Sequence, residues 1–220
     1  MELEEAHQKL KQIENIPFGL LFTPKELEYM KTNKGRTGQL LEFALGLHLS
    51  NTNLDFSDGE LKTNKCDKLG NPKETIFITQ ICTCIDDLFL KKHFQEMNLY
   101  EKIHNILYVP VMKEGRPESW MFLPSVHIDL EDPKFIGIRK QLEDDYYNIC
   151  DQLEEKVLTS LDGFIGTSNG KYIQIRCKDF KNEDGNYSPI YSELYGRYVS
   201  NKNHAFYFKK QFIKDIRFYT

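Results

Sequence analysis

Apolar residues recur at helical spacing in several parts of the chain, most clearly from residue 133 to about residue 158. In that segment the apolar positions form one stripe, and acidic residues occupy the opposite face. Thr23, Pro24 and Glu26 together form a helix start: an N-cap, a proline at the first helical position, and a glutamate that can bond back to the cap. Helices are therefore predicted over residues 3–16, about 24–30, about 40–49 and 133–158.

Strand patterns lie between these helices. In residues 75–85, β-branched, aromatic and small residues alternate, which predicts a central strand that pairs with a hairpin formed by residues 53–63. Ser168-Asn169-Gly170 has the composition of a tight hairpin turn, so a strand is expected on each side of it. The predicted strands are residues 60–63, 75–85, 106–112, 163–167, 171–178 and 204–210. This mixture predicts an α/β protein with a mixed sheet.

Composition limits the class of protein. With 220 residues, 40% of them hydrophobic, the chain can bury one substantial core or two small lobes, and we expect a monomer. No apolar run approaches the ~20 residues that a membrane span needs, and residues 1–5 are too acidic and polar for a signal peptide. A cytoplasmic protein without a membrane partner is expected. The five cysteines include no C-x-x-C pair and are expected to be reduced, structural thiols.

Charge is unevenly distributed along the chain. The net charge is −4, which by itself argues mildly against a nucleic-acid partner. Residues 171–220, however, hold 10 Lys+Arg and 5 Asp+Glu, a balance of +5, so the preceding 170 residues carry −9. A basic C-terminal segment on an acidic protein fits a localised surface that faces DNA, although charge alone does not exclude an accident of composition.

Candidate catalytic residues lie in the segment from Asp55 to Lys62. Two carboxylates can hold Mg²⁺, and a lysine beside the second can orient the attacking water and offset phosphate charge. Because residues two apart on a strand share a face, Glu60 and Lys62 are expected to face one cleft, while Leu61 faces the core. Asp55 would arrive from the preceding turn. Asp58 is a competing candidate, because on a longer strand it would share that face; the turn composition of Asp58-Gly59 favours Asp55.

Glu42 is a further candidate. It interrupts an almost entirely apolar helix, and a buried glutamate costs several kcal/mol unless it is paired or bound to a metal. A supporting catalytic role is predicted. The alternative is an exposed position on a polar helix face, beside Gln39 and Phe43.

Six blocks of sequence carry a family resemblance: residues 38–46, 55–56, 60–63, 67–75, 170–178 and 206–212. In this order they resemble the MutH-like family of DNA endonucleases, which includes the mismatch-repair nicking endonuclease and related type II restriction enzymes. The resemblance implies a restriction-endonuclease-like mixed sheet flanked by helices, in a single domain of residues 1–220. It also implies a mainly catalytic lobe up to about residue 110 and a mainly recognition lobe from about residue 111, with a DNA-binding cleft between them.

The resemblance also implies roles for single residues. Asp55, Glu60 and Leu61 would bind Mg²⁺, for which Mn²⁺ is an expected substitute, and Glu42 would lie beside this metal site. Lys102 matches a second active-site lysine that contacts DNA near the scissile phosphate, although without the resemblance it would be interpreted as a surface lysine.

DNA contacts are expected from two regions. Lys34 and Arg36 belong to a mobile basic turn over residues 34–38 that would meet phosphates, and a plain loop before a helix explains the turn equally well. In the C-terminal region, Arg176 and Lys178 would read base edges and Tyr207 would sense adenine methylation, as the resemblance implies. Two further lysines, Lys209 and Lys210, follow that tyrosine and are also expected to bind DNA.

The expected activity is Mg²⁺-dependent hydrolysis of double-stranded DNA at a short site, of the GATC kind in this family, leaving 5′-phosphate and 3′-hydroxyl ends. Two departures from the repair enzyme favour a type II restriction endonuclease: the gap between Asp55 and Glu60 is shorter, and Cys177 stands in place of a proline. The alternatives are a repair nickase stimulated by a mismatch-repair ATPase, and a catalytically silent DNA-binding module.

Overall fold

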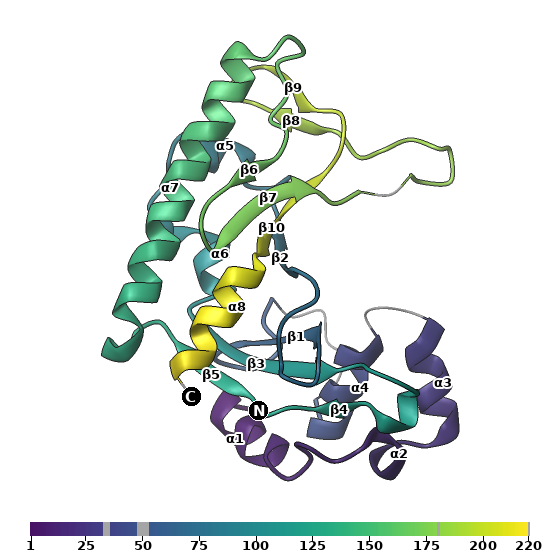
Figure 1. Ribbon diagram of the computed structural model, residues 1–220. Helices are drawn as coiled ribbons and strands as arrows, with labels where there is room; N and C mark the ends of the chain where they lie inside the picture. The colour runs from purple at the N-terminus through teal and green to yellow at the C-terminus, as the bar shows by residue number, and fades with distance from the viewer. Residues whose placement is uncertain (33–35, 48–52, 180, 220) are drawn as a thin grey trace. The chain divides into compact units, whose positions relative to one another are not determined.

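The computed structural model describes residues 1–32, 36–47, 53–179 and 181–219. They form a mixed α/β protein with several sheets and helices, as the sequence predicts (Figure 1). The chain divides into two compact units. The first comprises residues 1–76, 102–132 and 213–220, and the second comprises residues 77–101 and 133–212. The units are thus interleaved along the sequence, and the functional division expected near residue 110 stays a prediction.

The sheet of the first unit is built around one buried strand, β3 (Asn105–Met112). β1 (Glu60–Cys66) pairs with it in parallel, so that Glu60 lies opposite Ile106. β4 (Met121–Phe122) and β5 (Val126–Asp129) pair with β3 in the antiparallel sense. The strands predicted at residues 60–63 and 106–112 are therefore confirmed, and this sheet is mixed.

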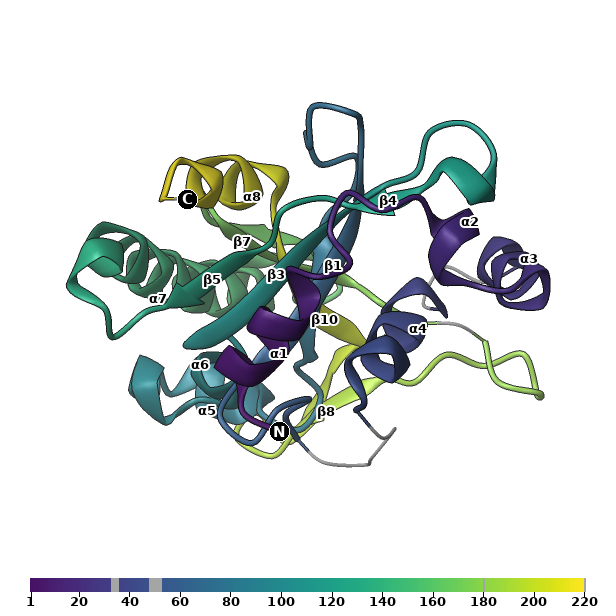
Figure 2. The ribbon, with the colours of Figure 1, turned by 90° about the horizontal axis from the view of Figure 1, so that it is seen from below.

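In the part of the chain that the structure describes, four helices precede this sheet: α1 (Leu3–Leu10), α2 (Phe18–Leu21), α3 (Pro24–Thr32) and α4 (Arg36–Leu45). α1 contacts both α4 and β3 (Figure 2). The buried apolar side chains of these four helices pack against the sheet and form one core with it. Leu61 of β1 and Phe122 of β4 belong to this core. The predicted capping box is present: Thr23 N donates to Glu26 Oε2 at 2.7 Å, and Glu26 N donates to Thr23 Oγ1 at 3.4 Å.

Two helix boundaries differ from the prediction. α1 ends at Leu10 rather than near residue 16, and a turn follows in which Asn15 has a φ of 60°. α4 begins at Arg36, so the part of the predicted mobile turn after residue 35 is helical; buried Thr37 accepts a hydrogen bond from Lys113 Nζ at 2.6 Å, which fixes this end. α4 ends at Leu45 rather than near residue 49, because Gly46 adopts a φ of 81° and closes the helix.

The sheet of the second unit has the order β2-β10-β7-β6. β2 (Ile76–Gln80) pairs with β10 (His204–Phe208), which pairs with β7 (Ile173–Cys177) and through it with β6 (Ser168–Asn169). The prediction that residues 75–85 pair with the hairpin of residues 53–63 is therefore wrong. Gln80 is instead tied to the start of β10, because Asn203 Nδ2 donates to Gln80 Oε1 at 2.7 Å and Ile81 N donates to the His204 carbonyl at 3.1 Å.

The longest helix described is α7 (Ile136–Thr159). The predicted apolar stripe of that helix is confirmed, since Ile138, Leu142, Tyr146, Ile149, Leu153 and Val157 are all buried. The remaining elements described are α5 (Ile85–Phe89), α6 (Asn98–Glu101), β8 (Ile190–Ser192), β9 (Arg197–Ser200), α8 (Lys210–Ile216), and four 3-10 turns at Phe94–Glu96, Pro117–Ser119, Pro133–Phe135 and Arg217–Tyr219.

A buried aspartate on α7 fixes the β6–β7 hairpin. Asp145 is 3% exposed, and its carboxylate accepts hydrogen bonds from the backbone N–H groups of Lys171, Tyr172 and Ile173 at 2.8, 2.5 and 3.1 Å. A Cβ at Gly170 would lie 2.3 Å from Asp145 Cγ, so only glycine fits there. The hairpin turn consequently lies after Asn169, not at residues 168–170 as predicted, and residues 163–167 form no strand.

All five cysteines are free thiols, as expected. Among the residues that the structure describes, none of the helices has the length and apolar character needed to cross a membrane.

Asp145→Ala should lower the free energy of unfolding by about 3 kcal/mol, because three backbone N–H groups, two of them buried, would lose their acceptor. Urea denaturation followed by circular dichroism measures this change. Asp144→Ala is the matched control, since Asp144 is the neighbouring residue of the same helix and is exposed. Equal effects of the two substitutions would contradict the capping role of Asp145.

Candidate active site

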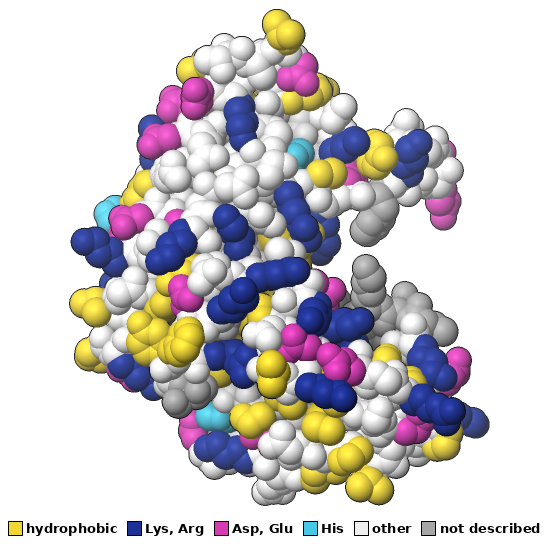
Figure 3. Space-filling view, in the orientation of Figure 1, with side chains coloured by type: hydrophobic (Ala, Val, Ile, Leu, Met, Phe, Trp, Pro, Cys, Tyr) yellow, Lys and Arg dark blue, Asp and Glu magenta, His cyan; other side chains and the backbone are white. Residues whose placement is uncertain are grey.

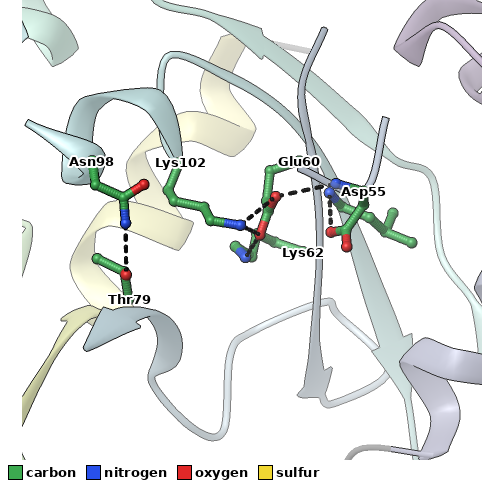
Figure 4. Close-up of polar contacts among 7 residues, drawn as sticks. Asp55, Glu60, Lys62, Thr79, Asn98 and Lys102 are labelled. Atoms are coloured by element: carbon green, nitrogen blue, oxygen red, sulfur yellow. Dashed lines mark hydrogen bonds and ion pairs between the residues drawn. The ribbon is translucent and has the colours of Figure 1, made fainter. Parts of the chain in front are cut away.

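Two charged side chains on β1 are buried on one face of the strand. Glu60 and Lys62 are 4% and 9% exposed, and Lys62 Nζ lies 2.6 Å from Glu60 Oε1 (Figure 4). Leu61, between them, belongs to the apolar core. The strand thus presents an acid and a base to one side and an apolar residue to the other, as the alternation predicts.

Asp55 approaches this strand from the irregular segment before it. Asp55 Oδ2 accepts a hydrogen bond from Leu61 N at 3.0 Å, and Asp55 N donates to Glu60 Oε2 at 3.4 Å (Figure 4). The segment turns tightly at Gly59, where a Cβ would lie 2.7 Å from the Asn105 carbonyl oxygen. A side chain at position 59 would push this segment away from β3 and take Asp55 with it.

Asp58, the competing candidate, is engaged elsewhere. Its Oδ1 accepts a hydrogen bond from Leu3 N at 2.8 Å, at the start of α1. It also precedes the strand, because β1 begins at Glu60, so it does not share a strand face with Glu60 and Lys62. The structure therefore places Asp55, rather than Asp58, beside the glutamate.

Lys102 is the most distant member of this group in sequence. It lies just before β3, and its Nζ is 3.2 Å from both carboxylate oxygens of Glu60 (Figure 4). Only 15% of its side chain is exposed. The parallel pairing of β1 with β3 brings the beginnings of the two strands together, and this pairing delivers Lys102 to Glu60.

Glu42 on α4 completes the group electrostatically. The side chain is half-buried, and burial together with the charges of Asp55 and Glu60 raises its pKa, which the charge of Lys62 opposes. The pKa of Asp55 is likewise raised by desolvation of its carboxyl group and by the charge of Glu60. The N–H of Leu61 and the charges of Lys62 and Lys102 oppose that shift. Burial and the neighbouring acids therefore both oppose ionisation of Glu42 and Asp55.

Such a set of donors suits a hard divalent cation. Carboxylate and carbonyl oxygens are the ligands that Mg²⁺ and Mn²⁺ accept, and a cation among these acids would relieve the repulsion that raises the pKa values. Asp55 and Glu60 could supply carboxylate oxygens. Leu61 could contribute only through its backbone, which already contacts Asp55.

The predicted recognition residues gather on a different sheet, in the second unit. Arg176 Cζ lies 4.0 Å from the centre of the Tyr207 ring, and Lys178 Nζ lies 3.1 Å from the centre of the Phe77 ring. The two rings are in edge contact, with centroids 5.8 Å apart. We call these four residues the cation–aromatic cluster. Phe77 was absent from the sequence-based set, because only the pairing of β2 with β10 brings it to Tyr207.

The other predicted DNA contacts have different surroundings. Lys209 Nζ donates to the Gly170 carbonyl at 2.7 Å, which ties it to the β6–β7 turn, whereas Lys210 is exposed at the start of α8. Lys34 and the side chain of Arg36 lie outside the residues described. On the face shown in Figure 3, Lys and Arg side chains lie over the region of β7 and α8.

Comparison of the chain with models of protein families and with curated proteins gave no match. The assignment of a function therefore depends on the residues and their geometry.

Glu42→Gln should raise the melting temperature of the metal-free protein at about pH 8. The pKa of Glu42 is raised in the folded protein, so at pH values above the ordinary glutamate pKa the folded protein binds more protons than the unfolded chain. The free energy of unfolding therefore falls as the pH rises through this range. The melting temperatures of the wild-type protein and Glu42→Gln should converge at pH values below the ordinary glutamate pKa, where Glu42 is protonated in both the folded and the unfolded state. Thermal scans in EDTA across this range measure the difference, with Glu155→Gln on exposed α7 surface as the control.

Proposed function

We propose that the chain is a Mg²⁺-dependent endonuclease of the MutH-like kind that cuts double-stranded DNA at a short site, as a type II restriction enzyme does. The observation that carries the proposal is the convergence of Glu42, Asp55, Glu60, Lys62 and Lys102 from α4, the segment before β1, β1 itself and the start of β3. Both lysines contact Glu60, Asp55 contacts the same strand, and Glu42 lies within electrostatic range of Asp55 and Glu60. Acids and lysines grouped in this way are used in metal-dependent hydrolysis of phosphodiesters. The restriction-endonuclease-like arrangement of the fold belongs to the same proposal.

The metal would be held by Asp55 and Glu60, with the Leu61 carbonyl as a third ligand. When bound, Mg²⁺ supplies positive charge that polarises the phosphate and acidifies a water molecule. The two lysines would exchange part of their contact with Glu60 for contact with the substrate. Lys62 would orient the attacking water and offset phosphate charge, and Lys102 would contact DNA near the scissile phosphate.

The reaction is a simple hydrolysis. The water gives up one proton to solvent as its oxygen forms a bond to phosphorus. The bond from phosphorus to the 3′ oxygen breaks, and that oxygen takes up a proton from solvent, so no net proton is consumed in forming the hydroxyl. The products carry a 5′-phosphate and a 3′-hydroxyl. Charge from Lys62 and Lys102 would stabilise the extra negative charge on the phosphate in the transition state.

Sequence reading is assigned to the cation–aromatic cluster. Arg176 is exposed while its guanidinium rests on Tyr207, so its orientation is set before DNA arrives. A guanidinium can donate two parallel hydrogen bonds to the major-groove edge of guanine. Tyr207, only 8% exposed, would act mainly by holding this guanidinium in place.

The purified protein should convert supercoiled plasmid to discrete linear fragments in Mg²⁺ and leave it intact in EDTA. Asp55→Asn and Glu60→Gln should each lower the cleavage rate about 10³-fold, because a lost ligand removes several kcal/mol of transition-state stabilisation. Asp58→Asn keeps an acceptor oxygen for Leu3 N and should retain activity. If Asp58→Asn alone lost cleavage, Asp58 rather than Asp55 would be the metal ligand. Nicked circles as the stable product would contradict a restriction enzyme.

Arg176→Ala should flatten the preference between the target site and its single-base variants by roughly 1–3 kcal/mol, since it removes a base contact. Lys210→Ala should instead weaken binding to all sequences about equally and reduce the salt dependence, as a phosphate contact would. Competition binding in Ca²⁺ at fixed salt separates the two. A uniform loss of affinity in Arg176→Ala would make this residue a phosphate contact.

A further inference from the structure

Three potential metal ligands converge in the first unit, apart from the acids around Glu60. Glu4 and His7 are one turn apart on α1, and His127 lies on β5. Glu4 Oε2 lies 3.8 Å from His7 Nδ1 and 3.9 Å from His127 Nδ1. One ligand atom from each of the three residues lies within 4.8 Å of the other two. We call these residues the histidine cluster.

A hydrogen-bond relay fixes the tautomer of His127. Asn105 Nδ2 donates to the Asp58 carbonyl at 2.8 Å, so the amide oxygen of Asn105 faces the opposite way, 2.8 Å from His127 Nε2. That oxygen can only accept, and His127 Nε2 must therefore carry the proton. The lone pair of neutral His127 is left on Nδ1, the atom that faces Glu4. Histidines that bind metals commonly donate their other N–H in this way.

The spacing of the cluster is close to that of a tetrahedral site. At metal–ligand distances of about 2.1 Å, ligand atoms on Zn²⁺ lie roughly 3.4 Å apart. The two Glu4–His distances, 3.8 and 3.9 Å, exceed this value by about 0.5 Å or less. Glu4 can move to make up the difference, because 60% of its side chain is exposed, whereas His7 is held with 15% exposed. The exposed side of Glu4 also leaves room for water as a fourth ligand.

We propose that Glu4, His7 and His127 form a divalent metal site of the two-histidine, one-carboxylate kind, with Zn²⁺ as the preferred ion. Imidazole nitrogen with carboxylate oxygen suits Zn²⁺ better than Mg²⁺, which takes oxygen ligands. The ion would join α1 to β5. The contacts form a closed ring. Leu3 N of α1 donates a hydrogen bond to Asp58, the Asp58 carbonyl accepts one from Asn105, and the Asn105 amide oxygen accepts one from His127. His127 in turn lies beside Glu4 of α1.

This ring includes the segment that carries Asp55. Asp58 lies between Asp55 and Glu60, and it contacts α1 through its side chain and Asn105 through its backbone. An ion in the histidine cluster would thus hold α1, β5 and the turn before β1 in a fixed arrangement.

Isothermal titration of the metal-free whole chain with Zn²⁺ tests the site. Because the acids near Glu60 could also bind Zn²⁺, the titration is done in the Asp55→Asn, Glu60→Gln double variant, with folding checked by circular dichroism. One Zn²⁺ per chain is expected, with a rise in melting temperature. Co²⁺ in place of Zn²⁺ should give the intense visible absorption of tetrahedral coordination.

Variants of the cluster locate the binding. Glu4→Gln, His7→Gln and His127→Gln should each lower Zn²⁺ affinity at least about 100-fold, and Asn105→Ala about 10-fold, because Asn105 orients a ligand without touching the metal. His93→Gln is the matched control, as His93 is an exposed histidine outside the cluster. Affinity unchanged in Glu4→Gln, whose exposed side chain makes unfolding no concern, would overturn the proposal. So would the absence of Zn²⁺ binding in the double variant.

Discussion

Burial of the Glu60 carboxylate is the constraint on which the first unit depends. A carboxylate taken out of water costs several kcal/mol unless cations and hydrogen-bond donors surround it. Lys62 meets that need from the same strand, and Lys102 meets it from the start of β3. The register that places Glu60 opposite Ile106 is therefore also the register that pairs a buried acid with its second cation. A slip of β1 by one residue would place Lys62 among the apolar side chains of the core and Leu61 on the face that Glu60 and Lys62 now occupy.

Local patterns predicted the elements in which neighbouring residues decide the structure. The capping box at Thr23 and Glu26, the apolar stripe of α7 and the strand β3 all follow from periodicity or short-range side-chain chemistry. The shared face of Glu60 and Lys62 follows in the same way, from the two-residue period of a strand. Helix ends were less predictable, since α4 ends at a glycine whose positive φ overrides the apolar pattern that continues beyond it.

Long-range pairing accounts for what could not be predicted. The composition of β2 fits any buried strand, and nothing local indicates that it pairs with β10 rather than β1. Lys102 and Phe77 depend on such pairings, so composition and spacing left the first as a surface lysine and missed the second. The histidine cluster has the same origin, because His127 joins residues more than a hundred positions earlier through the pairing of β5 with β3.

The electrostatics of the acid group favour a functional origin over a structural one. A network that served only stability would pair each acid with a base, as Lys62 and Lys102 do for Glu60. Asp55 and Glu42 instead have pKa values raised by desolvation and by neighbouring acids, so their ionised forms oppose folding at neutral pH. Unfavourable charge of this kind persists where a ligand that is absent from the free protein supplies the missing counter-charge. A divalent cation and the positive groups that accompany it are the counter-charge that the geometry around Glu60 suits.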